Sequence, residues 1–175
     1  MIDSCQFESH SVEKLAFSPL AQDSHTVFAV GGASQVSLRS FNAKRQIETD
    51  ELDESRLLAT CSLSSPLTDV CFLPYEPHNF LLASTEAGSL HLLQANGDAT
   101  DLVERSQWNI HKGAVSAIAC ESHTDVVATA GDDGMIQLRH VESDKALTVF
   151  DSDCVAVHTL AFASRDTVVS GNAVG

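Results

Sequence analysis

Short runs of apolar residues alternate with polar residues along the chain, and many of these runs end in a turn of small or acidic residues. The clearest example is VVATAGDDGMIQLR, from Val126 to Arg139, which is typical of a strand, a tight turn and a second strand. Similar patterns occupy residues 28–38, 81–92 and 168–175. Alternation with a period of two indicates strands, and no comparable stretch has a helical period. The pattern predicts an all-β protein built from one unit that occurs about four times.

The turn glycines give the period of this unit. Gly134 follows Gly88 by 46 residues, and Gly175 follows Gly134 by 41 residues. Ser34 occupies the same place 54 residues before Gly88. The longer first interval contains an acidic insertion, residues 46–56, which has the composition of a solvated loop. Periods of about 40 to 45 residues with four short strands in each are typical of the blades of a β-propeller.

The predicted units span residues 10–45, 66–106, 111–152 and 155–175, and the last unit is shorter than the others. A further strand precedes each turn pattern, predicted at residues 12–17, 68–73, 114–119 and 156–162. Two more strand candidates, residues 56–63 and 146–150, follow the turn patterns of the first and third units. We therefore expect residues 1–175 to form one partial propeller.

The third unit carries the residues that make the repeat recognisable. His111 precedes its first strand, Thr129 lies in its second strand and Asp133 lies in the turn. This spacing resembles a WD repeat, although Arg139 stands where that family usually has Trp. The resemblance implies a structural trio, in which the hydroxyl and the carboxylate hydrogen-bond the imidazole inside the blade. The same three side chains could instead be a nucleophilic triad, with Thr129 as the attacking group and His111 as the base.

The other units keep fewer of these residues. In the second unit Ser84 is expected to correspond to the hydroxyl residue of the third unit, and Ala87 replaces the turn aspartate. No Trp-Asp dipeptide occurs in the chain. The resemblance to WD repeats therefore depends on spacing and strand pattern.

Several longer segments together resemble the nucleoporin 43 family, the small WD-repeat subunits of the Y-shaped outer-ring scaffold of the nuclear pore. These segments are SVEKLAFSPL at 11–20, RLLATCSL at 56–63, LTDVCFLP at 67–74 and the run from 126 to 162. The resemblance implies a non-catalytic scaffold that binds helical outer-ring nucleoporins and supports protein and RNA transport. It also implies a location at the nuclear envelope, and at kinetochores in dividing cells. Because the sequence stops within the fourth unit, we expect an N-terminal fragment with about four of seven blades.

The charge of the chain narrows the classes of partner. It has 24 Asp and Glu residues against 10 Lys and Arg, which gives a formal net charge of −14. Because phosphate binding requires clustered basic residues, we expect neither direct nucleic-acid binding nor attachment to an anionic membrane. No segment approaches the roughly 18 apolar residues of a membrane span. The five cysteines show no metal-binding spacing and suit a reducing compartment such as the cytosol or nucleus.

Two features leave alternatives open. Asp132 and Asp133 at a hairpin tip could hold Mg²⁺ for phosphoryl transfer, but that chemistry needs further carboxylates and a basic channel. Trp108 could anchor a partner or pack in the outer strand of a blade. We expect no catalytic residue, metal, cofactor or small-molecule substrate. The alternative within the same class is another WD-repeat adaptor, either a ubiquitin-ligase substrate receptor or a histone-tail reader.

Overall fold

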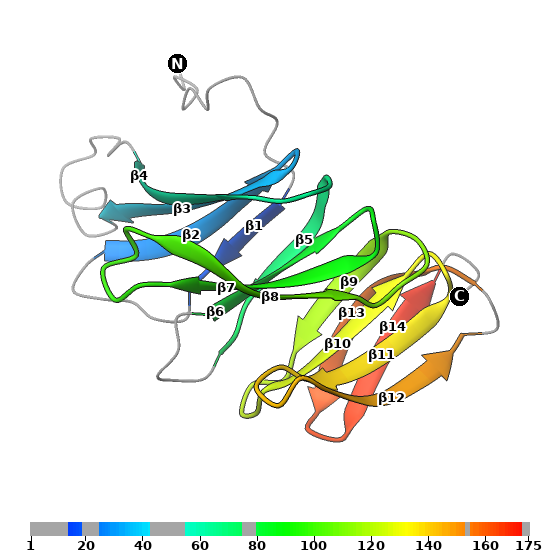
Figure 1. Ribbon diagram of the computed structural model, residues 1–175. Coiled ribbons are helices and arrows are strands. Elements are labelled where there is room, and N and C mark those ends of the chain that lie inside the picture. The colour runs from blue at the N-terminus through cyan, green and yellow to red at the C-terminus, as the bar shows by residue number, and fades with distance from the viewer. Residues whose placement is uncertain (1–13, 19–24, 43–54, 75–79, 153–154, 173–175) are drawn as a thin grey trace, which may run out of the picture.

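Three antiparallel sheets and a hairpin make up the part of the chain that the computed structural model describes, residues 14–18, 25–42, 55–74, 80–152 and 155–172 (Figure 1). Blade 1 contains β1 (Lys14–Phe17), β2 (His25–Gly32), β3 (Gln35–Asn42) and β4 (Arg56–Ser62). Blade 2 contains β5 (Leu67–Phe72), β6 (Phe80–Thr85), β7 (Ser89–Ala95) and β8 (Leu102–Asn109). Blade 3 contains β9 (Val115–Cys120), β10 (Val126–Gly131), β11 (Met135–His140) and β12 (Lys145–Asp151). The terminal hairpin contains β13 (Val157–Ser164) and β14 (Thr167–Asn172).

Each sheet is a simple meander in which consecutive strands pair. The tight turns between the second and third strands set the register, since Ala130 pairs with Ile136 across one turn and Ser84 pairs with Leu90 across the other. Gly88 and Gly134 close these two turns with φ angles of 82° and 75°, a region that favours glycine. The repeated turn glycines of the sequence therefore mark backbone positions that require positive φ.

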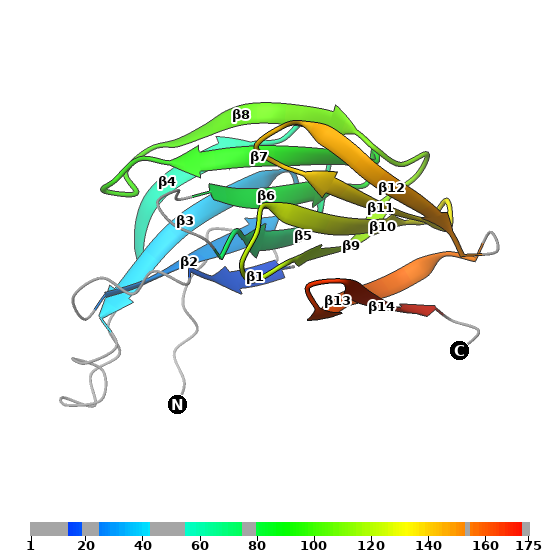
Figure 2. The same ribbon diagram turned by 90° about the horizontal axis from the view of Figure 1, so that it is seen from below.

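The first strands of the sheets, β1, β5, β9 and β13, contact one another in succession. The later strands lie progressively farther from this row, so that the sheets form a fan of neighbouring blades (Figure 2). This arrangement confirms the prediction of an all-β, β-propeller-like fold. Among the described residues no helix is long and apolar enough to cross a membrane.

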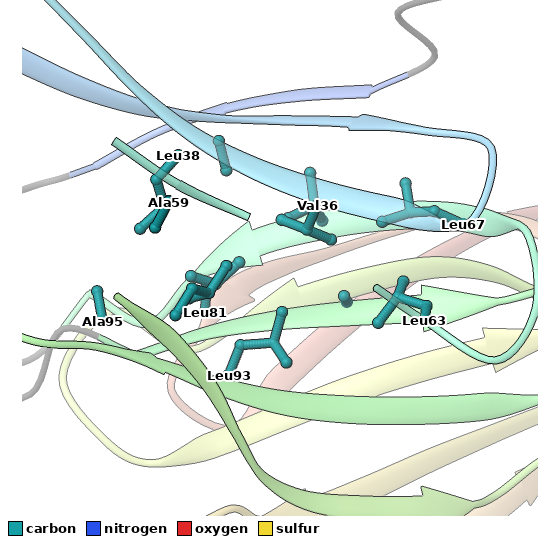
Figure 3. Packing of buried hydrophobic residues seen from close by; sticks show 12 residues of the cluster. Val36, Leu38, Ala59, Leu63, Leu67, Leu81, Leu93 and Ala95 are labelled. Atoms are coloured by element: carbon teal, nitrogen blue, oxygen red, sulfur yellow. The ribbon is translucent and has the colours of Figure 1, made fainter. Parts of the chain in front are cut away.

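The hydrophobic cores lie between the sheets. Between blades 1 and 2, Val36 and Leu38 of β3 face Leu81 and Leu93 of blade 2, with Leu67 beside them (Figure 3). A second core lies between blades 2 and 3, and a third lies between blade 3 and the terminal hairpin. Burying a Leu or Val side chain stabilises the fold by about 1.5 to 3 kcal/mol. Because each core needs residues from two sheets, no blade has an apolar core of its own.

The sheets differ from the predicted units at their boundaries. Arg56, expected both to end the acidic insertion 46–56 and to start a strand at 56–63, begins β4, which belongs to the sheet of blade 1 and lies outside the predicted unit 10–45. Residues 46–54 of that insertion lie outside the described residues. The fourth strand of blade 2, β8, runs on to Asn109, past the predicted unit end at 106.

We expect Gly88→Ala to lower the free energy of unfolding by more than about 2 kcal/mol. A Cβ at this position would overlap the carbonyl oxygen of His111 and would lie 2.7 Å from that of Gly113, at a φ of 82°. The matched control is Gly97→Ala, where a Cβ meets nothing within 4 Å. Urea unfolding followed by circular dichroism measures both variants. Equal stabilities for the two variants would contradict this account of the turn.

Candidate functional site

The structure brings together the three side chains that the sequence singled out in blade 3. His111 lies in the loop between β8 and β9, Thr129 in β10 and Asp133 in the β10–β11 turn. The Nδ1 atom of His111 lies 2.9 Å from Oδ1 of Asp133, and its Nε2 atom lies 3.1 Å from Oγ1 of Thr129. His111 is only 7% exposed and Thr129 only 2%. The imidazole is therefore held at both nitrogens within the blade.

Backbone groups complete the environment of Asp133. Its Oδ2 atom accepts the N–H of Lys112 at 2.9 Å, and its Oδ1 atom accepts the N–H of Met135 at 3.1 Å. Gly131 provides room for the ring, since a Cβ there would lie 2.6 Å from Nδ1 of His111. The carboxylate thus links the loop that enters blade 3 to the turn that closes its second strand.

The same contacts set the acidity of Asp133. Burial alone would raise the pKa of this carboxyl, but the N–H groups of Lys112 and Met135 and the ring of His111 all favour the anion. The net result is a pKa below the ordinary value of 3.8. The ionised carboxylate is the form that the folded state stabilises.

This geometry suits a structural role better than catalysis. Thr129 Oγ1 is buried and faces the imidazole, so a substrate cannot reach the hydroxyl. Both oxygens of Asp133 already accept hydrogen bonds, while the neighbouring Asp132 is exposed. Among the described residues no group of three or more His, Cys, Asp and Glu is placed to hold a metal ion. The Mg²⁺ hypothesis for Asp132 and Asp133 finds no further ligand in this part of the chain.

The corresponding turn of blade 2 is closed by a different residue. Thr85 Oγ1 accepts the N–H of Ser89 at 3.3 Å, as Asp133 accepts that of Met135 in blade 3. The hydroxyl of Thr85, the last residue of β6, therefore makes one of the turn contacts that Asp133 makes in blade 3, and this explains how Ala87 is tolerated there.

The expected equivalence of Ser84 and Thr129 is wrong. The pairing registers align Ser84 with Ala130, because each lies four residues before its turn glycine. Ser84 Oγ lies 2.9 Å from Thr68 Oγ1, on the neighbouring strand β5, and not against an imidazole. The spacing to the turn glycines shows the difference, since Ser84 lies four residues before Gly88 and Thr129 lies five before Gly134, and a shift of one residue reverses the face of a strand.

A second repeated contact joins the turns to the next blades. The carbonyl oxygen of Gly88 accepts the N–H groups of Ile110 and His111, at 3.0 and 3.1 Å. The carbonyl oxygen of Gly134 accepts the N–H of Ser152 at 2.9 Å, and that of Ser34 accepts the N–H of Leu63 at 2.7 Å. In all three cases the last residue of a turn binds the segment that leaves the outer strand of the same blade.

Trp108 lies on β8, the outer strand of blade 2, and packs half-buried against the core between blades 2 and 3. The guanidinium of Arg139, on β11, lies 5.0 Å from the centre of its ring. Arg139 also forms an ion pair of 2.7 Å with Asp144. Arg139 of blade 3 thus covers the tryptophan of the preceding blade. A role for Trp108 in partner binding stays a prediction.

Sequence reasoning missed three further pairs of side chains. His91, only 1% exposed, has Nδ1 at 2.7 Å from Oε2 of Glu104, and its Nε2 atom has no partner among the described residues. His140 Nδ1 lies 2.6 Å from Oδ1 of Asp125. The sulfur atoms of two cysteines, Cys71 and Cys120, lie 3.0 Å apart. The repeat gave no signal for this pair, because the pairing registers place Cys71 opposite Leu82 and Cys120 opposite Val127, and these positions are not equivalent in the two blades.

Comparisons with known proteins support the fold and leave the family undetermined. No model of a known protein family matches the chain. No curated protein matches its sequence. The fold is similar to that of the crystal structure of the computationally designed Ika4 protein, with a TM-score of 0.69 and 20% sequence identity over 98% of this chain and 91% of that one. At this identity the likeness identifies the β-propeller-like class alone.

We expect Asp133→Ala to lower the free energy of unfolding by roughly 1 to 3 kcal/mol, because it removes the hydrogen-bond partner of the buried His111 ring and of two backbone N–H groups. Asp132→Ala, in the same turn, is the matched control, since its exposed side chain makes none of these contacts. Thermal and urea unfolding measure both variants. A melting temperature for Asp133→Ala that equals that of the unmodified chain would refute the structural role.

The contribution of Asp133 should also depend on pH. Its pKa is lower in the folded state, so the stabilisation is present above the ordinary value of 3.8 and is lost as the pH falls through the folded pKa. We expect the stability difference between the unmodified chain and Asp133→Ala to be constant near neutral pH and to shrink below about pH 4. Urea unfolding at a series of pH values tests this. A difference that persists unchanged to pH 2 would contradict it.

Proposed function

We propose that this protein is a non-catalytic scaffold module that acts through contacts with other proteins. The observation that carries the proposal is the apolar surface of β12. All seven residues of this strand are exposed, and they include Val149 at 54% and Phe150 at 50%. Because neighbouring residues of a strand point to opposite faces, Val149 and Phe150 leave apolar side chains exposed on both faces of β12, and exposed apolar surface is typical of protein interaction sites.

A groove beside β12 extends this surface. It has a volume of about 630 Å³ and lies between the later strands of blade 3 and the terminal hairpin. Its apolar lining includes Ile136, Leu138, Leu147 and Phe162. Large apolar side chains of a partner would bury this lining, as at the centres of protein interfaces. The polar trio of blade 3, by contrast, is fully occupied by hydrogen bonds within the blade.

The finer proposal is that the chain is a WD-repeat protein of the nucleoporin 43 type. Support comes from the sequence segments that resemble that family, from the propeller-like fold and from the contacts of His111 with Thr129 and Asp133. In this proposal the module binds helical subunits of the outer ring of the nuclear pore. It serves transport of protein and RNA at the nuclear envelope, and it also acts at kinetochores. The net charge of −14 agrees with partners other than nucleic acid.

Affinity capture with the tagged chain from nuclear extracts, followed by mass spectrometry, tests the proposal. We expect outer-ring nucleoporins to be recovered, and recovery to fall at least tenfold for the double variant Val149→Asp and Phe150→Asp. Val103→Asp, an exposed apolar position on β8, is the matched control and should retain binding. Circular dichroism confirms that each variant is folded. Recovery of none of the outer-ring nucleoporins by the unmodified chain would count against the specific assignment.

A further inference from the structure

Two free thiols meet in the interface between blades 2 and 3. Cys71 lies on β5 and Cys120 on β9, and their Sγ atoms are 3.0 Å apart. The residues are 49 positions apart in the sequence, so the contact exists only because the two blades pack together. No part of the structural role described for His111 and its partners uses these thiols.

The strands hold the two sulfur atoms in place. The N–H of Ile118 on β9 donates to Oδ2 of Asp69 on β5 at 3.0 Å, and each cysteine lies two residues beyond one of these partners. Because side chains two apart point to the same face of a strand, one hydrogen bond between the blades sets the position of the thiol pair. The pair is therefore preorganised by backbone geometry.

The surroundings of the pair are apolar. Both cysteines pack, half-buried, against a core that includes Leu73, Leu82 and Val127. The thiol of Cys120 hydrogen-bonds the sulfur of Cys71, which lowers the pKa of Cys71 although burial and Asp69 oppose this. The same contact, together with burial, raises the pKa of Cys120. Cys71 is thus the thiol that ionises first, and thiolates are the reactive form.

We propose that Cys71 and Cys120 form a dithiol that peroxides oxidise to a disulfide bridging blades 2 and 3. The Cys71 thiolate attacks one oxygen of hydrogen peroxide, the O–O bond breaks, and the sulfur becomes a sulfenic acid while hydroxide leaves. The sulfur of Cys120 then loses its proton and attacks that of Cys71. The S–O bond breaks, an S–S bond forms and the oxygen leaves as water.

The overall reaction is balanced by the peroxide alone. Two thiols and one hydrogen peroxide molecule give one disulfide and two water molecules. The two sulfur atoms together lose two electrons, which the two peroxide oxygens gain. A small dithiol such as dithiothreitol supplies two electrons and two protons to reverse the cross-link. The site is therefore a reversible modification site that fixes one blade to the next.

Peptide mapping of the full chain after treatment with hydrogen peroxide tests the proposal directly. We expect a peptide pair linked through Cys71 and Cys120, restored to free thiols by dithiothreitol. Because the link closes a loop across two blades, we also expect the melting temperature to rise by about 5 to 15 °C. Cys61→Ser is the matched control, since Cys61 is a half-buried free cysteine on β4, and it should still form the link.

Two further measurements separate preorganisation from chance oxidation. In urea the link between Cys71 and Cys120 should form at least tenfold more slowly and should compete with pairings among all five cysteines. In native buffer Cys71→Ser and Cys120→Ser should each abolish it. Where a variant does not fold, peptide mapping of the peroxide-treated unmodified chain still tests whether Cys71 and Cys120 become linked. Sulfinic or sulfonic acid at Cys71 without a link, or no oxidation of either thiol, would overturn the proposal.

Discussion

The fold depends on a hydrogen bond that repeats at the end of each tight turn. In blades 1, 2 and 3 the carbonyl oxygens of Ser34, Gly88 and Gly134 accept N–H groups from the segment that leaves the outer strand. This segment begins at the outer edge of one sheet and must reach the first strand of the next. By holding it against the turn, the bond fixes where the next sheet starts, and buried backbone groups that would otherwise lack partners are satisfied. The spacing of the blades therefore follows from the geometry of the turns.

Because the apolar cores lie between sheets, the blades stabilise one another. Leu81 and Leu82 are adjacent on β6, yet the first packs toward blade 1 and the second toward blade 3. A blade in the middle of the fan thus contributes to two cores, and loss of one neighbour exposes half of its apolar surface. Architectures of this kind are described well by nearest-neighbour interactions between repeats. The free energy of unfolding therefore depends on pairs of packed blades and not on single blades.

The sequence contained the signals that determine the architecture and lacked those for several contacts. Alternating apolar residues and the turn glycines predicted the strands and the period, because φ near 80° at Gly88 and Gly134 restricts the choice of residue. The positions of His111, Thr129 and Asp133 were available through a family resemblance. The pairing of His91 with Glu104 could not be found, because a buried ring among leucines gives no periodic signal. The place of Ser84 was misassigned, although its distance from Gly88 is one residue shorter than that of Thr129 from Gly134 and so places it on the other face of the strand.

The packing of Trp108 gives this molecule an internal optical reporter. The sequence contains a single tryptophan, and its ring lies in the contact between blades 2 and 3 beneath the guanidinium of Arg139. Its fluorescence emission is therefore sensitive to the polarity of this one interface, whereas far-ultraviolet circular dichroism averages over all strands. When blades separate one after another, the two signals will diverge. The chain thus carries a natural probe that distinguishes local opening of the interface between blades 2 and 3 from global unfolding.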